Sequence, residues 1–157
     1  MAIDKVKAYF RAFGMEQRVQ ELPVSSATVA LAAEALHCAP ARIAKTLSFL
    51  VEGKPVLIVA AGDARIDNRK YKAQFSAKAK MIPAEDTEAL VGHAVGGVCP
   101  FAVNEGVTVY LDRSLQRFET VYPACGSANS AIELTIPELE QYSNYRCWVD
   151  VCKDWTA

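Results

Sequence analysis

The sequence has few of the residues from which metal sites and disulfide frameworks are built. It contains two histidines and five cysteines, and no CxxC pair occurs. Zinc sites and disulfide-stapled domains depend on closely spaced cysteine or histidine residues. We therefore expect no metal site, and we expect reduced thiols in a cytoplasmic protein, most of them small core residues. The cysteines are Cys38, Cys99, Cys125, Cys147 and Cys152.

Long hydrophobic runs are also absent. No apolar stretch approaches the ~20 residues that a helix needs to cross a bilayer. The first residues, MAIDKVKAYFRAF, carry charges throughout, unlike the apolar core of a signal peptide. The GxGxxG and P-loop motifs of nucleotide sites are missing, and so is the GxSxG elbow of serine hydrolases. The sequence thus argues against a membrane protein, a nucleotide-cofactor enzyme and a Ser–His–Asp hydrolase.

The sequence does contain enough apolar material for one folded domain. Its 157 residues are 52% hydrophobic and 22% charged, with a formal net charge of −1. A chain of this length buries a core without covalent or metal staples. No repeat, low-complexity tract or linker divides it, so we expect a single domain over residues 1–157.

Helix and strand signals alternate along the chain and predict an α/β fold, a single domain with a mixed central sheet and surrounding helices. Apolar runs at 46–51 and 56–61 predict a hairpin whose strands are buried on both faces. Ser25 or Ser26 is a good N-cap for the second helix, and Asp67 for the third. The expected helices cover residues 3–13, 27–36, 68–75, 83–90 and 137–142, with single turns at 41–44 and 113–118. The other expected extended segments cover residues 18–22, 78–82, 107–112, 131–134 and 146–151.

A glycine-rich loop at 92–101 is the most informative stretch. Adjacent glycines let a backbone approach a ligand closely, and exposed N–H groups can hold a carbonyl oxygen or a developing oxyanion. The same pattern also fits a tight turn, so both interpretations stay open. A nucleophilic Cys99 paired with His93 is a weaker alternative, because nothing in the sequence shows that these side chains meet. The candidate substrate-contacting residues of the loop are His93, Gly96, Gly97, Val98, Cys99, Pro100 and Phe101.

Two further candidates are a lysine and a segment of small residues. Lys45 precedes the apolar strand at 46–51. There its ammonium either reaches water or, aimed into a cleft, binds a phosphate or stabilises a carbonyl. Gly126 and Ser127 precede the strand at 131–134, so they fit either a turn or the wall of a small pocket.

Positive charge is concentrated in one segment. Residues 65–80 contain six basic residues and one acidic residue, a balance of +5 that leaves −6 on the rest of the chain. The overall charge argues against a nucleic-acid partner, whereas such a segment fits either a solvated helix face or a phosphate-backbone ligand. The candidate phosphate-binding residues are Arg65, Arg69, Lys70 and Lys72.

Three of these features, taken in order, resemble the freestanding aminoacyl-tRNA deacylases related to the editing domain of bacterial prolyl-tRNA synthetases, the YbaK-like family. They are Lys45 before an apolar strand, a GxxxP loop from Gly96 to Pro100, and Gly126-Ser127 leading into the next strand. The resemblance covers roughly residues 24–142. It implies the prolyl-tRNA-synthetase editing-domain (YbaK-like) fold with a central cleft, and trans-editing, the hydrolysis of the ester that links a wrong amino acid to tRNA.

The same resemblance implies roles for the candidate residues. Lys45 would be the functional lysine near the terminal adenosine, the backbone of the GxxxP loop would position the ester carbonyl and water, and Gly126 and Ser127 would line the aminoacyl pocket. The expected partner is the acceptor end of a mischarged tRNA, with an aminoacyl-tRNA synthetase as a second candidate. No cofactor, membrane or DNA partner is expected. Ala102 stands where family members often have glycine, so the small amino acid is left open among Ala, Ser, Cys and Thr.

An editing enzyme is the favoured interpretation among three. An aminoacyl ester is already activated, so backbone donors and a cation are enough to orient water and stabilise an oxyanion. A binding module of the same fold, which recognises aminoacyl or adenylate groups without turnover, remains an alternative. A thiol-redox protein is the third, and the missing CxxC pair counts against it.

Overall fold

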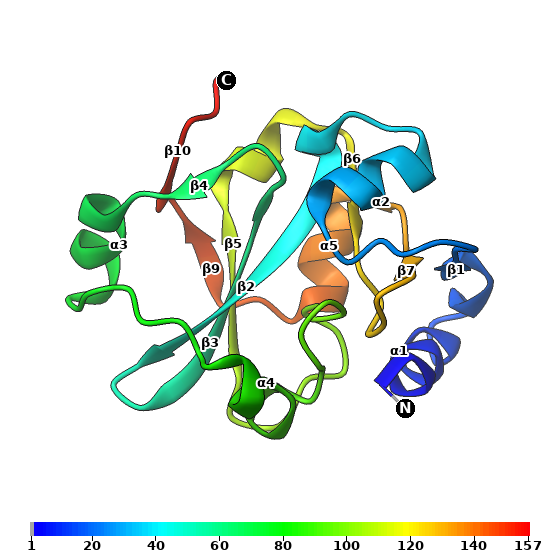
Figure 1. Ribbon diagram of the computed structural model, residues 1–157, viewed down its shortest axis with the longest axis horizontal. Coiled ribbons are helices and arrows are strands. Elements are labelled where there is room, and N and C mark those ends of the chain that lie inside the picture. The colour runs from blue at the N-terminus through cyan, green and yellow to red at the C-terminus, as the bar shows by residue number, and fades with distance from the viewer. Residues whose placement is uncertain (1) are drawn as a thin grey trace.

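The computed structural model describes residues 2–157, and its centre is a six-stranded mixed sheet (Figure 1). The strands are β2 (Ile43–Val51), β3 (Lys54–Ala61), β5 (Thr108–Asp112), β6 (Thr120–Pro123), β8 (Leu134–Thr135) and β9 (Cys147–Val149). Their order is β8-β6-β2-β3-β5-β9. The pairs β2–β3 and β6–β8 are antiparallel, and the others are parallel. The predicted fold class is therefore confirmed.

The hairpin of β2 and β3 forms the middle of this sheet. Its register runs from Ala44 opposite Ala61 to Val51 opposite Lys54. The turn is shorter than the sequence predicts: it consists of Glu52 and Gly53, whose φ angles of 52° and 77° are those of a type I′ turn. Residues 57–61 of β3 are fully buried, so this strand supplies the centre of the hydrophobic core.

Residues 2–157 contain five α-helices, one at each predicted place. They are α1 (Ala2–Arg11), α2 (Val29–Leu36), α3 (Asn68–Phe75), α4 (Ala84–Val91) and α5 (Ile136–Ser143). The predicted turns at 41–44 and 113–118 are the 3-10 helices η2 (Pro40–Arg42) and η3 (Arg113–Arg117), and a third, η1 (Glu16–Arg18), precedes the first extended segment. None of the helices in this part of the chain is long and apolar enough to cross a membrane.

The caps of two helices show how local and tertiary hydrogen bonds compete. Asp67 caps α3 as predicted, since its side chain accepts from two backbone N–H groups. The cap of α2 is Thr28 and not a serine, because the hydroxyls of Ser25 and Ser26 both contact the carbonyl of Ala128. The backbone N–H of Ser26 donates to the same carbonyl. This segment is thus held by a distant loop before the helix begins.

Two of the predicted strands were wrong in extent. The segment 78–82 contacts β2 through one bridge, Met81 opposite Phe49, and then enters α4 at Pro83, which has no N–H to continue a ladder. The segment 131–134 is divided between β7 (Ser130–Ala131), which pairs with β1 (Gln20–Glu21), and β8, which pairs with β6. Each short strand is defined by its partner rather than by its own composition.

Three short strands had no sequence signal of their own. β6 is four residues long and ends in proline, so it presents no apolar run. The two-residue strands β4 (Arg65–Ile66) and β10 (Cys152–Lys153) pair with each other and tie the C-terminal segment to the start of α3. Long-range pairing therefore creates these strands.

Helix α1 covers one side of the glycine-rich loop. Val6 and Phe10 are fully buried, and the Phe10 ring meets the Phe101 ring edge-on at 4.8 Å between centroids. Phe13, which the predicted helix places on the same apolar face, lies beyond the end of α1 and stays 48% exposed. The helix thus contributes packing behind the loop.

The Asp112 carboxylate joins three parts of the fold. It is fully buried at the end of β5, and it accepts hydrogen bonds from the backbone N–H groups of Ser114 and Val151, each at 2.9 Å. The Ser114 hydroxyl in turn accepts from the N–H of Ala61 at the end of β3. This chain of bonds fixes η3 against β3 and anchors the C-terminal segment.

Replacing Asp112 with alanine should therefore destabilise the protein strongly. Two buried N–H groups would lose their acceptor, and we expect the free energy of unfolding to fall by roughly 2–4 kcal/mol. Urea denaturation of Asp112→Ala and of Glu105→Ala, a control at an exposed loop carboxylate, measures the difference. Equal midpoints for the two variants would contradict the anchoring role.

Candidate active site

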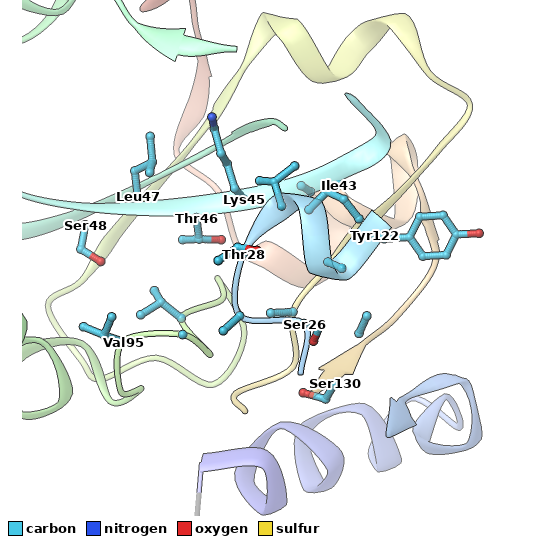
Figure 2. A pocket seen from close by; sticks show the side chains of 18 of the residues that line it. Ser26, Thr28, Ile43, Lys45, Thr46, Leu47, Ser48, Val95, Tyr122 and Ser130 are labelled. Carbon is cyan, nitrogen blue, oxygen red and sulfur yellow. The ribbon is translucent and has the colours of Figure 1, made fainter. Parts of the chain in front are cut away.

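A cavity lies along an open stretch of the β2 edge. β6 pairs with β2 only at Ile43 and Ala44, and the segment before α4 bonds to β2 only from Ser48 onward. Between these points a cavity of about 350 Å³ opens, bounded by β2, α2, the 95–98 part of the glycine-rich loop and β7 (Figure 2). The space exists because β6 and the segment before α4 pair with different parts of β2 and leave the stretch between them without a neighbour.

Polar groups of β2 face this cavity. Backbone N–H and C=O groups of alternate residues point to the same edge of a strand, and the Ser48 carbonyl on this edge accepts from Ile82 N–H. The N–H and C=O of Thr46 therefore point into the open stretch. The Thr46 hydroxyl is buried and has no hydrogen-bond partner among residues 2–157. In Figure 2, Thr46 and Ser48 extend from the same side of β2, toward Val95.

The rest of the cavity wall is mostly aliphatic. Among residues 2–157, no carboxylate, thiol or imidazole lines it, and Lys45 is its one charged residue. Nor do three His, Cys, Asp or Glu side chains gather anywhere in this part of the chain as a metal ion would require. The cavity can therefore act through hydroxyls, backbone groups and one cation. Aliphatic residues of the wall include Val29, Ala32, Leu36, Ile43, Val95 and Val98.

Lys45 stands at the border of the cavity. Its side chain leaves β2 on the opposite side from Thr46 (Figure 2), and its ammonium donates to the carbonyl groups of Gly62 and Ala64. Burial lowers the pKa of this lysine, while nearby Asp63 opposes that shift. Since both hydrogen-bond partners are acceptors, the geometry requires the lysine to donate. Lys45 is thus placed as an oriented cation.

The two glycine-containing loops meet beside the cavity. A Cβ atom on Gly97 would lie 2.6 Å from the backbone nitrogen of Ser127, so only glycine lets the loops touch. Gly96 has φ of +96° and lines the cavity together with Val98. Gly126 has φ of +92° and packs against the start of α1. The structure thus brings together two candidate segments that lie far apart in the sequence.

The buried side chains of the glycine-rich loop hold the loop in its conformation. His93 Nε2 lies 2.7 Å from the carbonyl of Phe101 and 3.5 Å from the Cys99 sulfur, so the two side chains do meet. Both are fully buried, and burial raises the pKa of the Cys99 thiol to about 12. Burial also lowers the pKa of His93. A protonated, enclosed thiol is a poor nucleophile. His93, Cys99 and Pro100 also lie outside the cavity wall.

Several cavity residues are not among those predicted from the sequence. The Ser127 hydroxyl is occupied by Asn129 and Ser130, and it is Ser130 that lines the cavity. Thr46 and Ser48 alternate with apolar residues inside a strand predicted to be buried on both faces. That alternation was the signal for a polar edge. Ser130 lies just after the predicted small-residue segment, but which hydroxyl faces the cavity depends on the pairing of β7 with distant β1.

Four basic residues of the 65–80 segment lie on β4 (Arg65) and α3 (Arg69, Lys70 and Lys72), away from the cavity wall. Arg65 is near enough to lower the pKa of Lys45, and β10 sets Lys153 opposite Arg65. Lys70 is engaged, since its ammonium contacts Asp150 and the carbonyl of Cys152. A basic surface formed by Arg65, Arg69, Lys72 and Lys153 therefore begins next to Lys45.

Comparison with known proteins assigns the chain to a family. The family pattern described as "Aminoacyl-tRNA editing domain" matches residues 24–142. The uncharacterized protein YwhH of Bacillus subtilis (strain 168) is 51% identical over 156 residues, which cover 99% of each chain. A proline--tRNA ligase of Geobacillus thermodenitrificans (strain NG80-2) is 31% identical over 109 residues, which span 69% of this chain and 19% of the ligase.

The fold has a match among solved structures. A crystal structure described as that of a candidate trans-editing enzyme for prolyl tRNA synthetase superimposes with a TM-score of 0.86 at 27% identity, over 97% of each chain. This match extends the likeness beyond the region covered by the family pattern. The chain therefore belongs to the aminoacyl-tRNA editing-domain family, the YbaK-like family that its sequence resembles.

Proposed function

We propose that this protein is a cytoplasmic trans-editing aminoacyl-tRNA deacylase, which hydrolyses the ester of a mischarged tRNA carrying a small amino acid. The observation that carries the proposal is the cavity at the open edge of β2, which combines aliphatic walls and backbone polar groups with one oriented cation leading to a basic surface. Membership of the editing-domain family supports the same reaction class.

The chemistry follows from what the cavity contains. Water attacks the ester carbonyl, and backbone groups of Gly96 and Val98, which line the cavity, stabilise the oxyanion that forms. Lys45 contributes a fixed positive charge near the terminal adenosine. General-base catalysis would need the neutral amine of Lys45, and we assign it instead the charged form, whose ammonium donates to two carbonyl groups. Catalysis then rests on positioning and electrostatics, which suit an ester that is already activated.

A non-catalytic binding module is the second candidate. It is favoured by one observation: of the described residues, those that line the cavity include no carboxylate, thiol or imidazole. The two functions differ in turnover, so a direct hydrolysis assay decides between them.

Replacing Lys45 with alanine should reduce hydrolysis without abolishing binding. Release of amino acid from a panel of mischarged tRNAs, carrying Ala, Ser, Cys or Thr, should be rapid for the wild type. Lys45→Ala should lose at least about tenfold in kcat/KM, ~1.4 kcal/mol of transition-state stabilisation. Lys54→Ala, at an exposed lysine of the hairpin, is the matched control. Equal rates for the two variants would remove Lys45 from the reaction, and no wild-type turnover would leave the binding module.

Adding one methyl group at Gly97 should separate the two loops. The new Cβ would clash with backbone atoms of Ser127, which cannot give way as a side chain can. We expect Gly97→Ala to remain folded by circular dichroism and to lose at least about tenfold in kcat. Wild-type kcat in this variant would show that the close approach of the loops is irrelevant to the reaction.

Reversing charges on the basic surface should weaken tRNA binding. Arg69→Glu and Lys72→Glu should each lower affinity and reduce the slope of log K against log salt by about 0.7–0.9 for each phosphate that the variant no longer neutralises. Lys54→Glu makes the same charge change at the turn end of the hairpin and should leave the slope unchanged. If all three variants bind alike at each salt concentration, the basic surface is only a solvated helix face.

A further inference from the structure

The Gly62–Ala64 turn that holds Lys45 is itself held by a partly buried arginine. Arg117 on η3 forms a two-pronged ion pair with Asp63, with Nη1–Oδ2 at 2.9 Å and Nη2–Oδ1 at 2.5 Å. The Arg117 side chain is only 14% exposed, and paired geometry of this kind is more rigid than a single contact. Asp63 is the central residue of the turn, so the pair fixes both flanking carbonyl groups.

Four of the five N–H donors of the Arg117 guanidinium have partners. It lies between the rings of Phe118 and Trp155, whose centroids are 4.7 Å and 5.0 Å away. Besides the two bonds to Asp63, one donor bonds to the carbonyl of Ser114 and one to the carbonyl of Thr156. Arg117 is not part of the cavity wall. It can therefore influence the site only through the turn.

The turn has little freedom to settle elsewhere. A Cβ atom on Gly62 would lie 2.0 Å from the carbonyl oxygen of Pro40, so the backbone is packed directly against η2. On the other side, the N–H of Ala61 is held by the Ser114 hydroxyl. With both sides fixed, the Arg117–Asp63 pair determines where the carbonyl groups of Gly62 and Ala64 point.

We propose that Arg117 is a positioning residue of the site, which acts through Asp63 to hold the turn whose carbonyl groups orient the Lys45 ammonium. This inference rests on the proposed function for its kinetic consequence. An ammonium carries three N–H donors, and the turn engages two of them. The third stays available for substrate only while the turn keeps its position. Loss of the pair should therefore lower kcat more than it raises KM.

The same arrangement makes Asp63 an electrostatic partner of Lys45. The charged and titratable groups around this ammonium are Asp63, Arg65 and Cys152, with Arg117 behind Asp63. The Cys152 thiol, whose pKa is raised to about 12, stays neutral in an ordinary titration. Asp63→Asn removes a nearby negative charge and should lower the pKa of Lys45. Arg117→Gln leaves the Asp63 charge uncompensated and should raise it.

Two variants with opposite expected shifts test the proposal. The pKa of Lys45 is measured from the ε-carbon resonance of 13C-lysine-labelled protein, assigned by its loss in Lys45→Ala. Kinetics with the mischarged tRNA that the wild type hydrolyses fastest give kcat and KM. We expect kcat to fall about tenfold in both variants with KM within about twofold, and the alkaline limb of the pH profile to move down in Asp63→Asn and up in Arg117→Gln. Because the ammonium form is the active one, activity is lost as pH rises through the pKa of Lys45.

Arg113→Gln is the matched control, since Arg113 lies on the same 3-10 helix and contacts exposed Asp150 instead. It should keep the wild-type kcat and pH profile. Shifts of Lys45 in the same direction in both test variants, or no shift, would overturn the proposal. If Arg117→Gln does not fold, the test rests on Asp63→Asn, in which the pKa of Lys45 must fall if the proposal is right. A wild type without turnover would remove the deacylase function. The titration of the Lys45 resonance would still test whether the Arg117–Asp63 pair acts on Lys45.

Discussion

The site depends on one constraint, the divided pairing of strand β2. Along one edge it pairs with β3 over its whole length, and along the other it pairs with β6 at two residues only. Farther along that edge the Ser48 carbonyl and the Leu50 N–H bond to the 80–82 segment. The N–H and C=O groups of Thr46 between these contacts must meet solvent or a ligand, because buried backbone groups are not left without partners. Here they face a cavity closed by α2 and the glycine-rich loop. The unpaired stretch of this strand edge thus forms a cavity wall, where it is less open to pairing with another chain.

The shape of the site also depends on close backbone contact between the two glycine-containing loops. Gly97 brings the glycine-rich loop against Gly126 and Ser127, and α1 packs its buried aromatic residues behind Phe101. His93 and Cys99, which as a pair suggest nucleophilic chemistry, are enclosed and bonded to the backbone of the same loop. Their contribution is to fix the loop.

Basic residues follow one another in space from the border of the cavity outward. Lys45 marks the border, Arg65 follows on β4, and Arg69 and Lys72 continue on α3. A net charge of −1 hides this order, because the acidic residues are distributed elsewhere. The structure also shows that one member of the predicted set, Lys70, is used internally to hold the C-terminal segment. The position of each basic residue, rather than their number, therefore decides what the surface can bind.

The sequence by itself determined the fold class, the five helices, the central hairpin and the family, because these are written in local periodicity, capping residues and the order of short motifs. It also singled out Lys45 and both loops. Only the tertiary structure decided that Ser130 and not Ser127 lines the cavity, that β6 exists, and that Arg117 reaches the turn beside Lys45. Arg117 and Asp63, for example, lie 54 positions apart in the sequence. Such contacts form only when packing brings distant segments together, and no local pattern encodes them.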